Sequence, residues 1–399
     1  MTAAENIRSA ARGARFVRAD LHIHSFGRGG SYDVTDAAMT PAAIVTTAIA
    51  KGLDVVSITD HNRIGNVEEA LREAEGKDIL VVPGVELSTP AGHLLLYAPT
   101  FDALERAVGR LAFDEDRKQC RTSAFEVLQV AQEFGAIVIA AHVDLDQGIE
   151  KAVNGYGDAK VSVLSSPTLV ALEIAHAAAE PWYTERDAEA PRRKLAQDRI
   201  DRLGALFGGT LPKIQSSDAH TLGALGRNWT QTEKLTRLKL GALDWTAFRA
   251  AFTDPEARVR IEETVPMAVP RILGLHTTGG FLDEQTLPFS DNLTCIIGGR
   301  GSGKSTALET LRAVCGHTPK EDLVGSDAWP DEAHVLYRDE FGDEYHVVLR
   351  QGERTDGDNP LAEPVLVHLG AALSRRQSWD ESKVPSLGGF SAGGPPVVG

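Results

Sequence analysis

The sequence predicts an α/β fold in two parts, a barrel-like (β/α) domain followed by a smaller α/β domain. Between residues 16 and 262, short apolar runs rich in β-branched residues alternate with amphipathic helical segments. Polar residues, many of them histidines, follow the ends of several apolar runs. Strands that alternate with helices pair in parallel, and barrels of such strands carry their site residues at the carboxyl ends of the strands.

The elements of the first domain follow from local signals. A helix is expected to begin at Thr40, where Thr-Pro supplies an N-cap and a first-turn proline, and to end at Gly52. The next run, LDVVSITDHN, is apolar and then abruptly polar, as a buried strand that ends at a site would be. The same pattern recurs in ILVVPGVELS, in SAFEVLQVAQEFG with AIVIAAHVD, in LVALEIAH, and in RRKLAQDRIDRLGALFGG with LPKIQSSDAH.

A second domain is expected after two prolines in ETVPMAVPR. Its strand DNLTCIIGG leads into a glycine-rich loop and a helix, and HVLYRDEFGDEYHVVLR predicts a hairpin that turns at Gly342. The final residues are rich in Gly, Pro and Ser, and we expect them to be disordered. The expected divisions are an N-terminal extension (1–15), the first domain (16–262), a linker (263–272), the second domain (273–378) and the tail (379–399).

Composition limits the classes of function. The formal net charge of −15 argues against nucleic-acid binding over the whole surface, although a local basic groove is compatible with it. The three cysteines fit neither a disulfide framework nor a zinc ribbon. Because no apolar run reaches the ~18 residues of a membrane span and the N-terminus lacks a signal peptide pattern, we expect a cytoplasmic protein without a membrane partner.

The histidines are the strongest functional signal. Of twelve in the chain, seven lie at or beside predicted strand ends within the first 220 residues. His22 and His24 are two residues apart on one strand, so both imidazoles point to the same side, and Asp218 and His220 repeat this spacing. Imidazole and carboxylate together suit Zn, Mn or Fe, and these ligands exceed what one ion can use. The pattern therefore indicates a site for two or three divalent metal ions.

The segments DLHIHS, ITDHN, PGVELS, GHLLLY, AAHVD and SSDAH, in this order, resemble the motifs of the PHP (polymerase and histidinol phosphatase) family over residues 16–262. The resemblance implies a distorted seven-stranded (β/α) barrel that binds up to three divalent ions. It also implies hydrolysis of phosphomonoesters or phosphodiesters by a metal-bound hydroxide. Carried over residue by residue, the ligands of the family fall on His22, His24, His61, Glu86, His93, His142, Asp218 and His220.

Three further residues of the first domain are candidates. Asp33 lies nine residues past His24 and could be the ninth ligand only if the glycine-rich loop between them folds back. Asp60 is expected to orient an imidazole rather than to bind an ion. Arg227 could clamp a substrate phosphate, with a surface salt bridge as the equal alternative.

A phosphate-binding loop is predicted in the second domain. The segment GGRGSGKST satisfies the pattern G-x-x-x-x-G-K-[ST]. Its residues are Gly298, Gly299, Arg300, Gly301, Ser302, Gly303, Lys304, Ser305 and Thr306. The backbone amides would hold the phosphates of ATP, the lysine would reach the β- and γ-phosphates, and Ser305 would bind Mg²⁺.

The segment around this loop resembles the N-terminal lobe of SMC-like and ABC-type ATPase heads. Its fusion to a PHP domain resembles the TrlF-like family, whose members are longer, so the chain looks truncated and its ATPase-like domain partial. No apolar strand ends in an Asp-Glu pair as a Walker B strand does. ATP hydrolysis by this chain alone is therefore not expected, and a homo-oligomer or a second polypeptide could complete the head.

The leading interpretation is a metal-dependent phosphoesterase, either a nuclease or a nucleotide phosphatase, coupled to an ATP-binding head. Its substrate would be a nucleic acid or a nucleotide, and its role DNA processing or defence against foreign DNA. Two alternatives remain open at this point: a phosphatase of small metabolites, and a metal-bound regulatory module with a nucleotide sensor.

Overall fold

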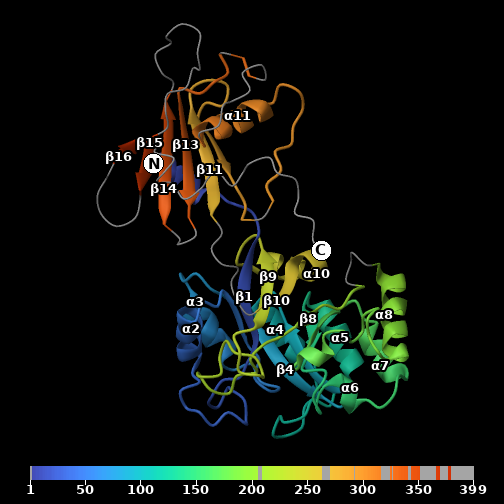
Figure 1. The fold of residues 1–399 in the computed structure, drawn as a ribbon. Coiled ribbons are helices and arrows are strands. Elements are labelled where there is room, and N and C mark those ends of the chain that lie inside the picture. Colours follow the sequence, from blue (N-terminus) through green and yellow to red (C-terminus); the bar gives the residue numbers. More distant parts are fainter. Residues whose placement is uncertain are drawn as a thin grey trace. The chain divides into compact units, whose positions relative to one another are not determined.

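The computed structural model describes residues 2–204, 209–262, 270–291, 293–315, 324–325, 327–339, 343–350, 365–368 and 376–378. The chain divides into two compact units (Figure 1). The barrel unit is Ala14–Thr264, and the second unit is Met1–Gly13 together with Val265–Gly399. The turn expected at Gly342 and the tail from residue 379 lie outside the described residues.

The barrel unit contains two five-stranded sheets. One has the order β10 (Val259–Glu262), β9 (Leu235–Leu240), β1 (Arg15–Ile23), β2 (Val55–Ile58), β3 (Leu80–Val81). The other has the order β4 (Gly84–Thr89), β5 (Gly92–Tyr97), β6 (Ile137–Ala140), β7 (Leu169–Glu173), β8 (Lys213–Ile214). Single parallel bridges join the two sheets at His61–Glu86 and at Ile23–Ala219. The sheets thereby close into a distorted barrel, which confirms the predicted fold class.

Strand direction differs from a purely alternating (β/α) barrel. Strands β1, β2 and β3 are parallel, as are β6, β7 and β8, but β5 is antiparallel to both β4 and β6. Only Pro90 and Ala91 join β4 to β5, and so short a connection can join only antiparallel strands. Strand β9 is also antiparallel to β1, to which it adds as an extra strand.

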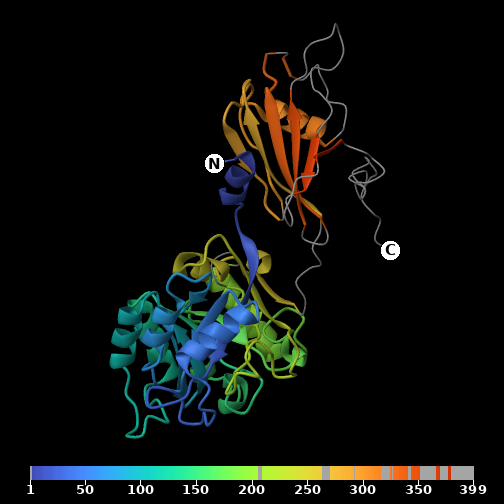
Figure 2. The same ribbon diagram turned by 90° about the vertical axis from the view of Figure 1, so that its left-hand side faces the viewer.

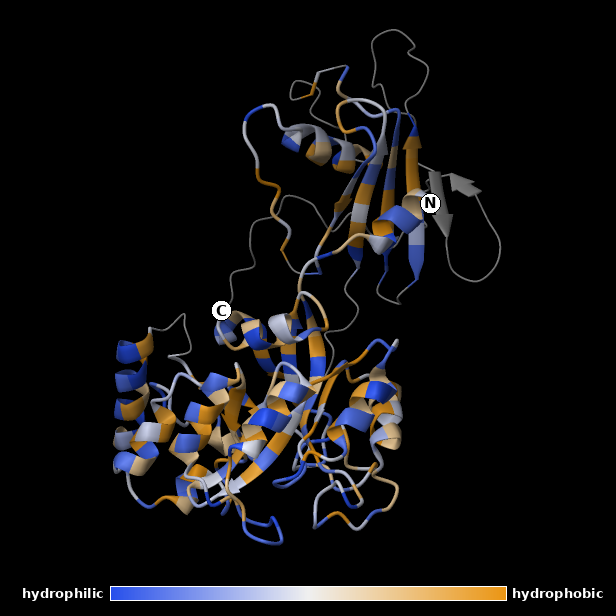
Figure 3. Cartoon of the chain, turned by 180° about the vertical axis from the view of Figure 1, so that it is seen from behind, coloured by the Kyte–Doolittle hydropathy of each residue, from blue (hydrophilic) through white to orange (hydrophobic). Residues whose placement is uncertain are grey.

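Helices surround the barrel. They are α2 (Pro41–Ala50), α3 (Val67–Ala74), α4 (Phe101–Gly109), α5 (Ala124–Glu133), α6 (Ile149–Ala152), α7 (Asp158–Leu164), η1 (Ala177–Ala179), α8 (Ala190–Leu203), α9 (Trp245–Ala251) and α10 (Pro255–Arg258). As predicted, the Thr40 hydroxyl caps α2 by accepting from the Ala43 amide at 3.2 Å. Hydrophobic and hydrophilic residues alternate along these helices (Figure 3), and every helix of the described residues is too short or too polar to span a membrane.

Apolar residues fill the barrel interior. Leu95, Ile139 and Ala171 are paired in register on neighbouring strands and are fully buried. The hydroxyl of Tyr97 donates to the carbonyl of Leu21 at 2.8 Å, which links β5 to β1. This packed core supports the polar residues that follow the strand ends.

The second unit is a six-stranded antiparallel sheet. Its order is β12 (Gln285–Pro288), β11 (Arg271–Thr278), β13 (Glu332–Arg338), β14 (Glu344–Arg350), β15 (Val365–His368), β16 (Arg376–Ser378). The pairing of β13 with β14 confirms the predicted hairpin strands. Helix α11 (Lys304–Val314) covers one face, where Ala313 and Val314 pack with Val335 and Val347.

Helix α1 (Ala3–Ser9), dark blue in Figure 2, packs on the other face of this sheet. Its Ala4 and Ile7 form a buried cluster with Leu273 and Leu336. Successive residues of a strand point to opposite faces, so Leu336 lies on the face opposite its neighbour Val335 and α11. The first residues, expected as a separate N-terminal extension, are thus part of the second unit.

The prediction of a strand at DNLTCIIGG is wrong for the residues of this segment that the structure describes. Residues 293–299 belong to no strand, and the side chains of Leu293 and Ile297 are 81% and 90% exposed. A strand forms only where a neighbour accepts its backbone hydrogen bonds, and within the described ranges no strand pairs with this segment. Apolar content alone therefore gave a misleading signal here.

Candidate metal centre

The ligands predicted from sequence come from different strand ends and meet at one rim of the barrel. His22 lies in β1, Glu86 in β4 and His93 in β5. The others follow the ends of β1, β2, β6 and β8, and they are His24, His61, His142, Asp218 and His220. His22 and His24 point to the same side, with their Nε2 atoms 3.1 Å apart.

The carboxylate of Glu86 is the centre of the group. It is completely buried. Its two oxygens lie 2.8–3.3 Å from nitrogen atoms of five imidazoles, those of His22, His24, His61, His93 and His142. Asp218 adds a second carboxylate, with Oδ1 3.0 Å from His24 Nε2. The backbone of Asp218 has a φ of +49°, a conformation that residues other than glycine rarely adopt and that is found at functional sites.

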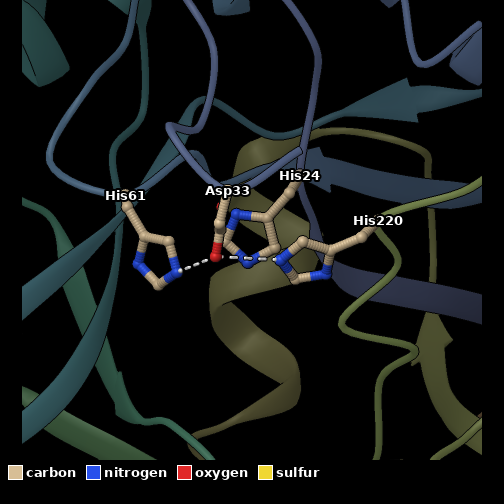
Figure 4. A group of neighbouring side chains, drawn as sticks. All are labelled: His24, Asp33, His61 and His220. Atoms are coloured by element: carbon tan, nitrogen blue, oxygen red, sulfur yellow. Dashed lines mark hydrogen bonds and ion pairs between the residues drawn. The ribbon is translucent and has the colours of Figure 1, made fainter. Parts of the chain in front are cut away.

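The loop before Asp33 does fold back toward the cluster. A Cβ atom at Gly30 would lie 2.2 Å from the carbonyl oxygen of Ser25, so the close return of the loop requires glycine at this position. Asp33 Oδ2 lies 3.3 Å from His61 Nε2 and 3.2 Å from His220 Nε2 (Figure 4). Asp33 therefore meets the geometric condition for a ninth ligand.

Three overlapping groups could hold an ion, because their ligand atoms lie within 4.8 Å of one another. The groups are His24, Asp33, His61 and His220; His22, His24 and Asp218; and His61, Glu86 and His93. Three buried atoms of the cluster, Glu86 Oε2, Asp218 Oδ1 and His142 Nδ1, make no contact with the geometry of a hydrogen bond, although imidazole nitrogens lie 3.0–3.5 Å from the two carboxylate oxygens. Such atoms cost about 1–3 kcal/mol each unless another group satisfies them. A cluster of divalent cations fits this donor set.

The opposite charges of the cluster shift the pKa values of its carboxyl and imidazole groups. Burial would raise the pKa of the Glu86 carboxyl, but the imidazoles of His22, His61 and His93 outweigh burial and hold it well below its usual range. Burial lowers the pKa of His61, but Glu86 and Asp33 outweigh this effect and raise it to about 10. Without ions, protons therefore occupy the cluster, and ion binding must displace them.

Asp60 affects the cluster indirectly, through the loop that carries Ser25 and Ser31. Its oxygens accept from the Ser25 amide at 2.6 Å and from the Ser31 amide at 3.1 Å, rather than from an imidazole. The Ser31 hydroxyl in turn lies 2.7 Å from His24 Nδ1. Burial raises the pKa of Asp60 to about 6 despite these bonds. Asp60 thus holds the loop that positions His24.

Sequence reasoning missed Glu173. This buried residue ends β7, and its Oε2 accepts from His22 Nδ1 at 2.9 Å and from the His142 amide at 3.1 Å. A proton on Nδ1 leaves the His22 Nε2 lone pair directed at the cluster. The available signal was an acid at the end of the apolar run LVALE.

Comparisons with known proteins agree with this geometry. Residues 20–164 match the PHP domain, and residues 273–367 match an AAA domain. The uncharacterized protein MJ1587 of Methanocaldococcus jannaschii is 32% identical to this chain over 131 residues, which cover 32% of this chain and 67% of that protein. The chain belongs to the PHP family. Membership in this family classes the chain as a hydrolase that acts on phosphate esters. The AAA-type region follows the PHP domain in the sequence.

Other relatives of this PHP protein share less of their length with it. A 5'-3' exoribonuclease of Haemophilus influenzae is 34% identical over 70 residues, which cover 18% of this chain and 23% of that enzyme. The structure of a lesion-specific endonuclease of Pyrococcus furiosus is 20% identical, with a TM-score of 0.42, and the match covers 66% of this chain and 62% of that one. The chain thus spans less than two thirds of both proteins.

An aromatic and cationic rim borders the PHP metal cluster. The Tyr32 side chain is 48% exposed, and its ring centroid lies 5.3 Å from that of His61. Lys118 Nζ lies 5.6 Å from the Tyr32 ring centroid. Arg117 anchors this loop by donating to the Asn62 carbonyl at 3.1 Å. The exposed Arg227 donates to the Gln231 carbonyl at 3.1 Å and forms no ion pair among the described residues.

The glycine-rich loop of the second unit has part of the predicted form. Gly301 and Gly303 have φ values of +80° and +85°, and α11 begins at Lys304 directly after them. The Lys304 ammonium donates to the Gly299 carbonyl at 2.5 Å, so it folds back on its own loop. Ser302 donates to the same carbonyl at 3.0 Å.

Proposed function

We propose that this chain is a metal-dependent phosphodiesterase that cleaves nucleic acid, with nucleotides as its smaller substrates. The observation that supports this proposal most strongly is the buried cluster centred on Glu86, with the exposed Tyr32 and Lys118 beside it. The similarity of 70 residues to a 5'-3' exoribonuclease supports the nucleic-acid substrate. A phosphatase of small metabolites would use the same chemistry, but it would not need an exposed aromatic residue that stacks on a nucleobase.

The cluster residues are proposed to hold two or three ions of Mn, Zn or Fe in the three overlapping groups. When bound, such ions supply Lewis acidity that activates water and neutralises phosphoryl oxygens. The chain itself positions the ligands: Glu173 fixes the His22 ring, Ser31 fixes the His24 ring, and Glu86 draws five imidazoles together. These contacts set the ligand geometry before substrate arrives.

The rim is proposed to bind the substrate strand. An aromatic face that is half exposed can stack on any base, and a neighbouring cation can contact the backbone phosphate. Tyr32 offers the aromatic face beside His61, and Lys118 offers the cation beside the Tyr32 ring. Arg227 is proposed as a further phosphate contact, since its side chain is exposed and lies in the loop after His220. The overall charge of −15 makes such a local patch necessary.

The second unit is proposed to bind ATP with Mg²⁺ at Gly298–Thr306 and to couple nucleotide binding to the nuclease. The match to an AAA domain over residues 273–367 supports this role. DNA processing or defence against foreign DNA, in the cytoplasm, is the biological setting we infer. Completion of the head by a second polypeptide or a second copy belongs to the same proposal.

The test is cleavage of bis-p-nitrophenyl phosphate and of a labelled single-stranded oligonucleotide in the presence of Mn²⁺. We expect both to be cleaved, oligonucleotide cleavage to weaken with salt, and both activities to vanish in the double variant His22→Ala, His24→Ala. Release of phosphate from small monoesters alone would replace the proposal with a metabolite phosphatase. Bound metal without any turnover would replace it with a regulatory module.

A further inference from the structure

A row of three histidines crosses the sheet of the second unit, away from the glycine-rich loop motif. His276, His334 and His346 lie on the neighbouring strands β11, β13 and β14. His276 pairs directly with His334, and His346 pairs with Leu336. Ring centroids are 6.0 Å apart for the first two and 5.2 Å apart for the last two. The row lies on the face that α1 covers, because it shares that face with Leu336.

The closest two imidazoles have the spacing of metal ligands. His334 Nδ1 and His346 Nε2 are 3.2 Å apart. Two nitrogens bound at ~2.0–2.1 Å to one tetrahedral ion lie about 3.3 Å apart. The Nε2 atoms of His22 and His24 in the PHP cluster show nearly the same separation, 3.1 Å.

The other nitrogen of His334 is held by a carboxylate. Glu332 Oε2 lies 3.3 Å from His334 Nε2, so the proton resides on Nε2 and the Nδ1 lone pair faces His346. A carboxylate that accepts from the outer nitrogen of a metal-binding imidazole is the usual support of such a ligand. We propose that His334 and His346 bind one borderline divalent cation of the zinc, nickel or cobalt class, separate from the PHP ions.

The surrounding charges leave the pair free to bind a cation. Burial lowers the pKa of His334 and is the main cause that lowers that of His346 to about 4, so both rings are neutral at pH 7. Glu332 is balanced by Arg350 at 2.7 Å. On the side of α1, Arg8 is paired with Glu344 at 2.7 Å. The ion would tie β13 to β14 on the face where α1 packs.

Neighbouring groups define a matched control. His276 Nδ1 lies 2.8 Å from the Thr286 hydroxyl, and its ring is one strand away from the close pair. Neither Thr286 nor Arg338, two other polar residues of this sheet, has a carboxylate that could replace a lost imidazole as a ligand. His276→Gln therefore removes an imidazole of the row but keeps the proposed ligands.

The experiment uses the full chain in a background that weakens the PHP cluster. His24→Ala with His61→Ala removes a ligand from each of the three PHP groups. Zn²⁺ content after dialysis and the visible absorption of added Co²⁺ are then compared with and without His334→Gln and His346→Gln. We expect the double glutamine change to remove one equivalent of Zn²⁺ and the four-coordinate Co²⁺ band, and His276→Gln to keep both.

Equal Zn²⁺ content in the background and in the double glutamine variant would overturn the proposal and leave a plain hydrogen bond between two neutral imidazoles. Should that double variant fail to fold, the single variant His346→Gln in the same background is compared with the background itself. Zn²⁺ at pH 7 should raise the unfolding temperature of the background by more than that of the His346→Gln protein, because both proteins keep the remaining PHP ligands and only the background has both imidazoles of the pair. Equal shifts in the two proteins would equally overturn the proposal.

Discussion

The carboxylate of Glu173 should control how tightly the PHP cluster holds its ions. Glu173→Gln keeps the size of the side chain but removes the charge that accepts from His22 Nδ1 at 2.9 Å. Both side chains are almost fully buried, so solvent screens the bond very little. An amide can also present its NH₂ to Nδ1, which would favour the proton on Nε2 and turn the lone pair of His22 away from the cluster.

The expected loss is 10- to 100-fold in ion affinity, the usual effect of removing an outer partner of a metal-binding imidazole, or about 1.4–2.7 kcal/mol. Burial lowers the pKa of His22, but Glu173 and Glu86 outweigh burial and raise it well above the usual value. The glutamine variant therefore has a lower His22 pKa in the ion-free protein. Its ion affinity should fall less steeply than that of the wild type as the pH decreases.

The assay is a competition titration of Mn²⁺ and Zn²⁺ against a chelator of known affinity, at several pH values. The exposed Glu180, on the segment that follows β7, provides the matched control Glu180→Gln. An affinity for Glu173→Gln within twofold of both the wild type and this control would refute the reasoning. It would mean that packing alone orients the His22 ring.

Three further outcomes follow from the structure. Tyr32→Ala should raise KM for an oligonucleotide about 5- to 150-fold, since stacking on one base contributes ~1–3 kcal/mol, and should leave bis-p-nitrophenyl phosphate hydrolysis unchanged; equal effects on both substrates would contradict a stacking role. Lys304→Ala should leave hydrolysis by the barrel within twofold in steady-state assays without ATP, whereas a large loss would show that the loop contributes to the active site. Burial lowers the pKa of Lys213 to about 8, below the 10.5 of an exposed lysine, so Lys213→Met should stabilise the fold by up to about 3 kcal/mol in chemical denaturation below pH 8. This gain should disappear as the pH rises through 10.5, because the unfolded wild type binds more protons than the folded one in that window; a pH-independent gain would assign it to packing instead.

The residues that the structure gathers into the cluster were predictable because each carries its own local signal. His22, Glu86 and Asp218 follow apolar runs, and the carboxyl ends of strands in a barrel converge whatever the order of the intervening helices. Asp33 was harder to place, because its position depends on a glycine loop whose return rests on close packing at Gly30. The family resemblance supplied the expectation of a ninth ligand, and only the structure shows the loop folded back.

Other features needed three-dimensional information. Glu173 is one acid among many in the sequence, and its partner His22 lies on a distant strand. Asp60 was expected to contact an imidazole, but its bonds go to Ser25 and Ser31, a choice that depends on the path of the loop. At residues 293–299, the apolar content predicted a strand, but a local sequence pattern does not show whether a neighbouring strand is available for pairing. Local signals thus placed residues correctly more often than they predicted which distant segments pair.

The position of α1 has a consequence for how the two halves of the chain can be handled. The polypeptide enters the second unit through α1, leaves it for the whole barrel unit, and returns at β11, so the barrel is an insertion within the second unit in terms of chain connectivity. No single cut separates two complete units. A fragment that begins after the barrel would lack Ala4 and Ile7 and would expose Leu273 and Leu336 to water. A fusion of residues 1–13 to β11 through a short linker is the form in which the second unit could keep that apolar surface covered.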